Sequence, residues 1–136
     1  MFFEKKENNE IEDLSKVAAL LIHAAKIDEK YSDHEEEIIK KTLSEIGAES
    51  INIEKIIDKA KKIEADSNQI LDFTKKVKNM TQQNRLKIIE SLWKIIYSNK
   101  EADIYETSLM RRLAGLLYID NKIMGDIKEK IKKENS

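Results

Sequence analysis

Apolar residues recur along this chain at the three- and four-residue spacing of an amphipathic helix. The first series predicts a helix from about Glu10 to Ile27 with one buried face, and it consists of Ile11, Leu14, Val17, Ala18, Leu21, Ala24 and Ala25. After polar interruptions, similar series predict helices over about 33–46, 53–63, 70–77, 82–97, 109–117 and 119–131. Gly47 can end the second helix in the left-handed conformation, and Thr81 can cap the fifth. The pattern therefore predicts an all-α bundle of about seven helices.

Composition supports a single helical domain. The chain has 136 residues with no proline and only three glycines, so the residues that punctuate β-rich folds are scarce. We expect a flexible N-terminus over residues 1–9, one helical domain over 10–133 and a short tail over 134–136. The 25 Lys and Arg residues nearly balance the 26 Asp and Glu residues, which argues against a dedicated nucleic-acid binder.

The N-terminal residues and the cysteine count indicate the compartment. A charge at Glu4 interrupts any signal-peptide core, and the longest uncharged apolar run, Val17 to Ala25, is far shorter than the ~20 residues that span a bilayer. The sequence has no cysteine, which excludes disulfides and thiolate sites. We therefore expect a cytoplasmic protein, with peripheral docking at a membrane left open.

The sequence contains an internal repeat with an offset of 71 positions. In each copy an apolar helix ends at Asp or Asn, a Ser or Asp follows four residues later, and a Glu comes three residues after that. The aligned pairs are Leu21 with Leu92, Asp28 with Asn99 (99 − 28), Ser32 with Asp103 and Glu35 with Glu106 (106 − 35). The repeat predicts two related hairpins of antiparallel helices.

The repeated turns have two interpretations. In the first, Ser32 with Glu35 and Asp103 with Glu106 form capping boxes at the starts of helices. Capping does not explain Asp28, a carboxylate at the negative end of the first helix, which either neighbouring lysines or a cation would compensate. In the second, a hard cation binds the turns, which offer only oxygen ligands: Asp28, Asp33 and Glu35, and Asn99, Glu101, Asp103 and Glu106. The spacing is not that of an EF-hand.

The two histidines are weaker candidates. His34 lies beside the first acidic turn and is a potential nitrogen ligand for Zn²⁺, but a single histidine near a helix start more often belongs to the solvated surface. His23 has no second histidine three or four residues away, so we expect it to pack at the edge of the core.

Both hairpins resemble the tellurite-resistance TerB family. The resemblance covers about Leu14 to Lys128 and is carried by residues 18–21, 25–28, 31–35, 92–97, 103–106 and 109–114. It implies an all-helical bundle of two related halves, an association with tellurite and general stress resistance, and divalent-cation binding by the acidic turns. No catalytic activity is established for the family, so the resemblance implies a protein that is not an enzyme.

The resemblance also narrows the metal hypothesis. The ligands it favours here are Asp28, Glu35, Asp103 and Glu106, with Ca²⁺, Mg²⁺ or Zn²⁺ as the cation and no other cofactor. The family's turn often reads Asp-Gly, whereas this chain has Asp28-Glu29 and Asn99-Lys100.

A second class of function is a protein-interaction module without metal chemistry. TerB-like modules occur beside J-domain cochaperones, which implies a scaffold or cochaperone-type role for this fold. The sequence identifies neither the protein partner nor the oligomeric state. A peripheral complex at a membrane surface is one form that such a partner could take. Candidate anchors for such a partner are Phe2, Phe3, Tyr31, Tyr105 and Tyr118.

Two further classes are disfavoured. Nucleic-acid binding would use the basic stretches at residues 75–78, 111–112 and 128–133, but acids interleave with them, so we expect no nucleic-acid partner. Without cysteine, a His pair or a Gly-rich phosphate loop, the chain lacks the usual signatures of an enzyme.

Overall fold

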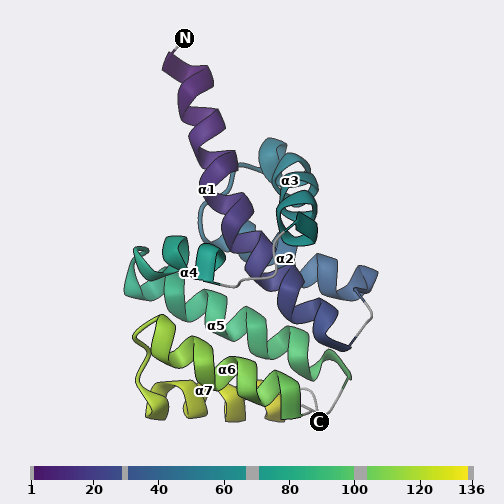
Figure 1. Cartoon of the computed structure of the whole chain (residues 1–136), viewed down its shortest axis with the longest axis vertical. Coiled ribbons are helices and arrows are strands. Elements are labelled where there is room, and N and C mark those ends of the chain that lie inside the picture. Colours follow the sequence, from purple (N-terminus) through teal and green to yellow (C-terminus); the bar gives the residue numbers. More distant parts are fainter. Residues whose placement is uncertain (1, 29–30, 67–70, 100–103, 135–136) are drawn as a thin grey trace.

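The computed structural model describes the backbone of residues 2–28, 31–66, 71–99 and 104–134, and the side chains of 9–27, 31–66, 71–98 and 104–134. Within these ranges the chain forms only helices, seven α-helices and three short 3-10 helices (Figure 1). In chain order they are α1 (Phe2–Ala25), η1 (Lys26–Asp28), α2 (Asp33–Glu45), η2 (Ser50–Asn52), α3 (Ile53–Asp66), α4 (Leu71–Lys78), α5 (Gln82–Ile96), η3 (Tyr97–Asn99), α6 (Ile104–Leu116) and α7 (Asn121–Glu134). The predicted all-α class is confirmed.

Helix boundaries agree with the pattern to within about three residues except at the first and sixth helices. The sixth, α6, begins at Ile104, before the predicted 109. The predicted start at Glu10 is wrong, because α1 begins at Phe2 and includes most of the stretch assigned to an N-terminal segment. Residues 4–7 read Glu-Lys-Lys-Glu, which are good helix formers but carry no apolar periodicity, so the pattern could not reveal them. At the end of α2, Gly47 has a φ of +110° as predicted, and the Thr81 hydroxyl accepts the Asn84 amide at 3.2 Å.

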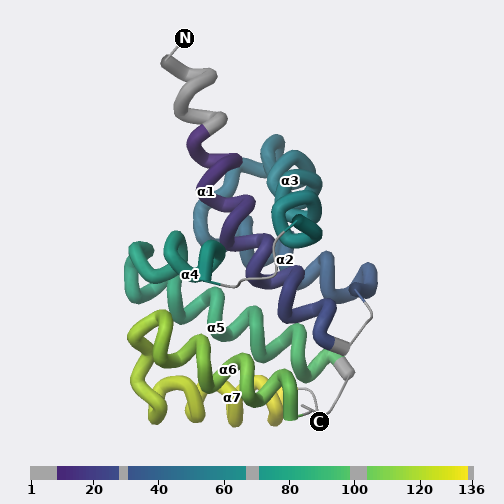
Figure 2. The backbone as a smooth tube through the Cα atoms, viewed as in Figure 1, coloured from purple at the N-terminus to yellow at the C-terminus, as the bar shows by residue number. Residues whose placement is uncertain are grey.

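The C-terminal half of α1 is the centre of the bundle. From Val17 to Ala25 every residue except His23 is at most 1% exposed, so this segment is buried on nearly all sides. It packs against α2, α3, α4 and α5. Figure 2 shows α1 crossing the upper part of the molecule beside α3, while α5, α6 and α7 lie below it. A helix that is apolar all round requires such burial.

The internal repeat is visible in the elements themselves. The ends of α1 and α5, Ala25 and Ile96, are 71 residues apart (96 − 25), and each is followed at once by a 3-10 helix. The helices α2 and α6 start and finish with the same offset (104 − 33 and 116 − 45). Equivalent positions such as Leu21 and Leu92 are both fully buried. The predicted hairpins, α1–α2 and α5–α6, therefore share one order of elements, and the helices of the first are in closer contact than those of the second.

The last helix, α7, packs against α5, which carries the single tryptophan of the sequence. The Trp93 indole nitrogen donates to Sδ of Met124 on α7 at 3.3 Å, and the ring stacks on Tyr97 with centroids 5.9 Å apart. A guanidinium nitrogen of Arg85 also donates to the Leu117 carbonyl at 2.8 Å, which ties α5 to the end of α6. In the part of the chain that the structure describes, none of the helices combines the length and apolarity needed to cross a membrane.

Candidate functional site

Each acidic turn connects the end of one helix to the start of the next, α1 to α2 in the first case and α5 to α6 in the second. Figure 1 shows α1 and α5 ending toward the same side of the molecule, where α2 and α6 begin. The C-terminal end of a helix carries partial negative charge and the N-terminal end partial positive charge. Carboxylates at the starts of α2 and α6 are therefore favourably placed, whereas an acid at the end of α1 needs a compensating charge.

At the first turn the capping box is complete. The Ser32 hydroxyl accepts the Glu35 amide at 3.2 Å, and Oε1 of Glu35 accepts the Ser32 amide at 2.9 Å. The carboxylate also accepts the Ser32 hydroxyl at 3.0 Å, and Glu35 is only 3% exposed. The capping interpretation is confirmed here, and it accounts for how a carboxylate is held below the surface.

At the second turn Glu106 takes the place of Glu35. It is the third residue of α6, as Glu35 is of α2, and it is 4% exposed. Burial raises the pKa of the nearby Tyr97 hydroxyl, and the negative charges of Glu129 and Glu106 raise it further. Burial would disfavour any charge here, and only the contribution of the two glutamates would favour a nearby cation.

Beside the first turn, Tyr31 joins α2 to α3. Its hydroxyl donates to Oε1 of Glu36 at 3.2 Å, and Nζ of Lys61 lies 2.9 Å from the same oxygen. Burial raises the pKa of Tyr31, and the Glu36 charge adds to the shift. The hydrogen bond from Lys61 in turn lowers the pKa of Glu36. Tyr31, a predicted anchor, is thus partly buried and already engaged within the domain.

The structure locates half of the predicted ligand set. Glu35 and Glu106 occupy equivalent buried positions, while Asp103 and the side chain of Asp28 lie outside the described residues. Within the described residues, no three or more histidine or acidic side chains are grouped so as to hold a metal ion.

The two histidines differ in their surroundings. His34 is exposed in the first turn of α2. The Nδ1 atom of His23 lies 3.4 Å from Oε1 of Glu64 on α3, at the edge of the core as predicted.

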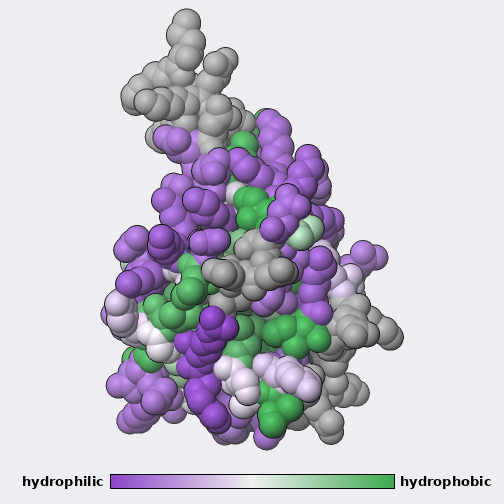
Figure 3. Space-filling model, in the orientation of Figure 1, coloured by the Kyte–Doolittle hydropathy of each residue, from purple (hydrophilic) through white to green (hydrophobic). Residues whose placement is uncertain are grey.

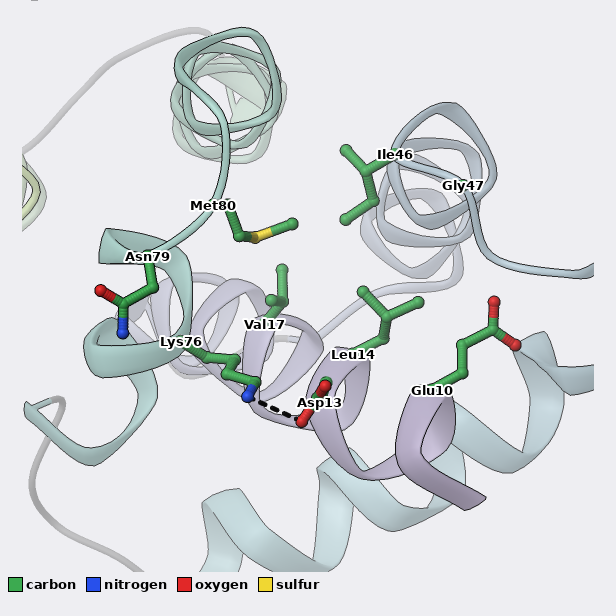
Figure 4. A pocket seen from close by; sticks show the side chains of 9 residues that line it. All are labelled: Glu10, Asp13, Leu14, Val17, Ile46, Gly47, Lys76, Asn79 and Met80. Atoms are coloured by element: carbon green, nitrogen blue, oxygen red, sulfur yellow. Dashed lines mark ion pairs between the residues drawn. The ribbon is translucent and has the colours of Figure 1, made fainter. Parts of the chain in front are cut away.

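A pocket between three elements was not predicted. It has a volume of about 370 Å³ and lies between α1, the end of α2 and the segment that joins α4 to α5. Figure 4 shows the apolar side chains Leu14, Val17, Ile46 and Met80 converging on it. Asp13 and Lys76, 2.9 Å apart, form an ion pair on one edge. The residues come from positions 10–80, so no local motif could have revealed the pocket.

Large hydrophobic side chains are exposed on several elements. They are Ile51 (75%), Ile104 (74%), Tyr105 (73%), Tyr118 (70%) and Leu71 (45%). In the view of Figure 3, hydrophobic surface is interrupted by hydrophilic residues on the lower half of the molecule, over α4 to α6. Of the predicted anchors, Tyr105 and Tyr118 are exposed, and the side chains of Phe2 and Phe3 lie outside the described residues.

The fold and the repeated turns define an all-α domain of two related helical hairpins, each with a buried glutamate at the start of its second helix. Residues 14–129 match the family model described as Tellurite resistance protein TerB, and the chain belongs to that family. No curated protein and no solved structure matches the chain.

Proposed function

We propose that this TerB-family protein is a non-enzymatic domain that binds a divalent cation between its acidic turns, as part of tellurite and stress resistance. The observation that carries the proposal is the equivalent burial of Glu35 and Glu106 at the starts of α2 and α6. Asp28 and Asp103, from the turns themselves, complete the ligand set.

Charge compensation is the physical basis of this proposal. Two buried carboxylates lie on the side of the molecule where the negative ends of α1 and α5 also lie. The pKa of Tyr97 is raised mainly by burial, and the charges of Glu129 and Glu106 add to the shift. We infer that these negative charges create a negative potential at the turns. A divalent cation with oxygen ligands relieves this potential, and Ca²⁺ or Mg²⁺ matches an all-oxygen set. Zn²⁺ would recruit a nitrogen ligand, for which His34 is the nearest residue in sequence.

A metal titration followed by amide NMR tests the proposal. Metal-free protein is titrated separately with Ca²⁺, Mg²⁺ and Zn²⁺, and we expect saturable shifts confined to residues 26–36 and 97–107. Glu106→Gln and Asp28→Asn, which keep shape but remove charge, should weaken binding at least tenfold.

Thr81→Ala is the matched control, because it removes a helix cap, that of α5, and Thr81 bonds the Asn84 amide rather than any of the four acids. It should lower the melting temperature and leave metal affinity nearly unchanged. Absence of localised shifts at millimolar metal would leave the acids with a capping role alone.

The second candidate is a metal-independent protein-interaction module of the scaffold or cochaperone type. It is favoured by the adjacent side chains Ile104 and Tyr105, both nearly three-quarters exposed at the start of α6. Affinity capture in the presence of a chelator should recover a specific partner with the wild type but not with Tyr105→Ala. Ile51→Ala, which removes an equally exposed side chain elsewhere, is the control.

A further inference from the structure

The groove between α2 and α5 contains a small polar cavity. Its volume is about 120 Å³, and the residues that line it come from one face of each helix. Thr42 lies against Ser91, and Nζ of Lys87 donates to the Glu45 carbonyl at 3.1 Å. A residue further along α2 therefore meets one earlier in α5, so the two helices run antiparallel across the groove.

Two buried hydroxyls form the floor of this cavity. Thr42 is 6% exposed and Ser91 is 2% exposed, and their oxygens lie 2.7 Å apart. The Thr42 oxygen is also 2.9 Å from the Ile38 carbonyl. The Thr42 hydroxyl has a single proton, so when it donates to the Ile38 carbonyl, the hydrogen bond between the two hydroxyls requires Ser91 to donate to Thr42. If Thr42 instead donates to Ser91, the Ser91 proton is released toward the cavity. The pair can thus offer a donor to a ligand without losing its own hydrogen bond.

The rim of the cavity carries more positive than negative charge. Lys41, Lys87 and Lys94 line it together with Glu45 and Glu90. The Glu90 carboxylate is shared between Lys94 at 3.5 Å and Lys130 of α7 at 3.4 Å. Lys41 has no hydrogen-bond or ion-pair partner among the residues that the structure describes. Three lysines and two glutamates therefore line the cavity, which leaves one positive charge in excess.

We propose that this cavity binds a small inorganic oxyanion, of the phosphate, sulfate or tellurite type. Ammonium groups and a hydroxyl donor are the groups that bind oxyanions, and the volume admits an ion of three or four oxygens but not a nucleotide. The cavity lies between α2 and α5 and uses none of the acids in the turns, so this proposal is independent of the cation proposal.

Amide NMR titration with sodium phosphate, sulfate and tellurite, each against sodium chloride at equal ionic strength, tests the site. We expect saturable shifts centred on residues 38–45 and 87–94 with at least one of the three oxyanions. Lys41→Gln should weaken that binding at least threefold, since it removes one of the cationic groups. Ser91→Ala should weaken it without unfolding the protein, because Thr42 keeps the Ile38 carbonyl as its acceptor.

The matched control is Lys62→Gln, which removes an exposed and unpartnered lysine on α3 among the described residues. It should leave the affinity unchanged. The proposal is overturned if none of the oxyanions gives saturable shifts in the groove up to tens of millimolar. It is equally overturned if Lys41→Gln and Lys62→Gln weaken binding to the same extent, which is the behaviour of diffuse surface charge.

Discussion

The Glu64 carboxylate of α3 accepts a hydrogen bond from Nζ of Lys26 at 2.8 Å, although 38 residues separate the two in sequence. The Glu64 side chain is 9% exposed, so removing Lys26 would leave it in a position where water solvates it poorly. We expect Lys26→Met to lower the free energy of unfolding by about 1 kcal/mol, since Lys26 itself is half exposed. Urea unfolding measures this, and Lys62→Met, at an exposed position of α3, is the comparison.

The helix caps at Ser32 and Thr81 should differ in strength. Thr81→Ala removes one hydrogen bond to the Asn84 amide and should cost about 1 kcal/mol of unfolding free energy. Ser32→Ala should cost more, roughly 2 kcal/mol, because the Ser32 hydroxyl also donates to the buried Glu35 carboxylate. Thermal unfolding of both variants checks the order. Equal losses would mean that the Glu35 carboxylate does not depend on the Ser32 hydroxyl.

Gly47 and Gly125 should respond oppositely to alanine. A Cβ at either position meets no atom within 4 Å, so backbone conformation decides the outcome. Gly47 has a φ of +110°, where an L side chain is strained, and Gly47→Ala should destabilise the protein by about 1 kcal/mol. Gly125 lies within α7, where alanine is the better helix former, so Gly125→Ala should stabilise it by roughly half to one kcal/mol. Chemical denaturation distinguishes the two signs.

Acid should weaken the junction of α2 with α3 through Glu36. The Lys61 hydrogen bond holds the pKa of Glu36 below its ordinary value of 4.5 in the folded protein. A lowered folded pKa means that this stabilisation is complete above pH 4.5 and is lost as the pH falls through the folded value. Glu36→Gln should therefore lose less stability than the wild type between neutral pH and acid. The urea midpoints of both proteins are measured across this pH range. If both midpoints fall by the same amount, this linkage is contradicted.

Local order in this protein follows from the sequence. Helix spacing, the Ser32 cap and the left-handed Gly47 depend on residues within four or five positions of one another, so each was predicted correctly. The internal repeat also predicted that Glu35 and Glu106 would be equivalent. The early start of α1 was missed because its first turns have helix-forming residues without an apolar stripe.

The tertiary structure alone decided which distant side chains meet. The bonds of Lys26 with Glu64 and of Thr42 with Ser91 span 38 and 49 residues, and neither partner carries a local pattern that points to the other. The same holds for the apolar pocket beside α1, which joins residues of three elements. Periodicity shows which face of a helix is buried, but the neighbour against which that face packs depends on how all seven helices fill one core.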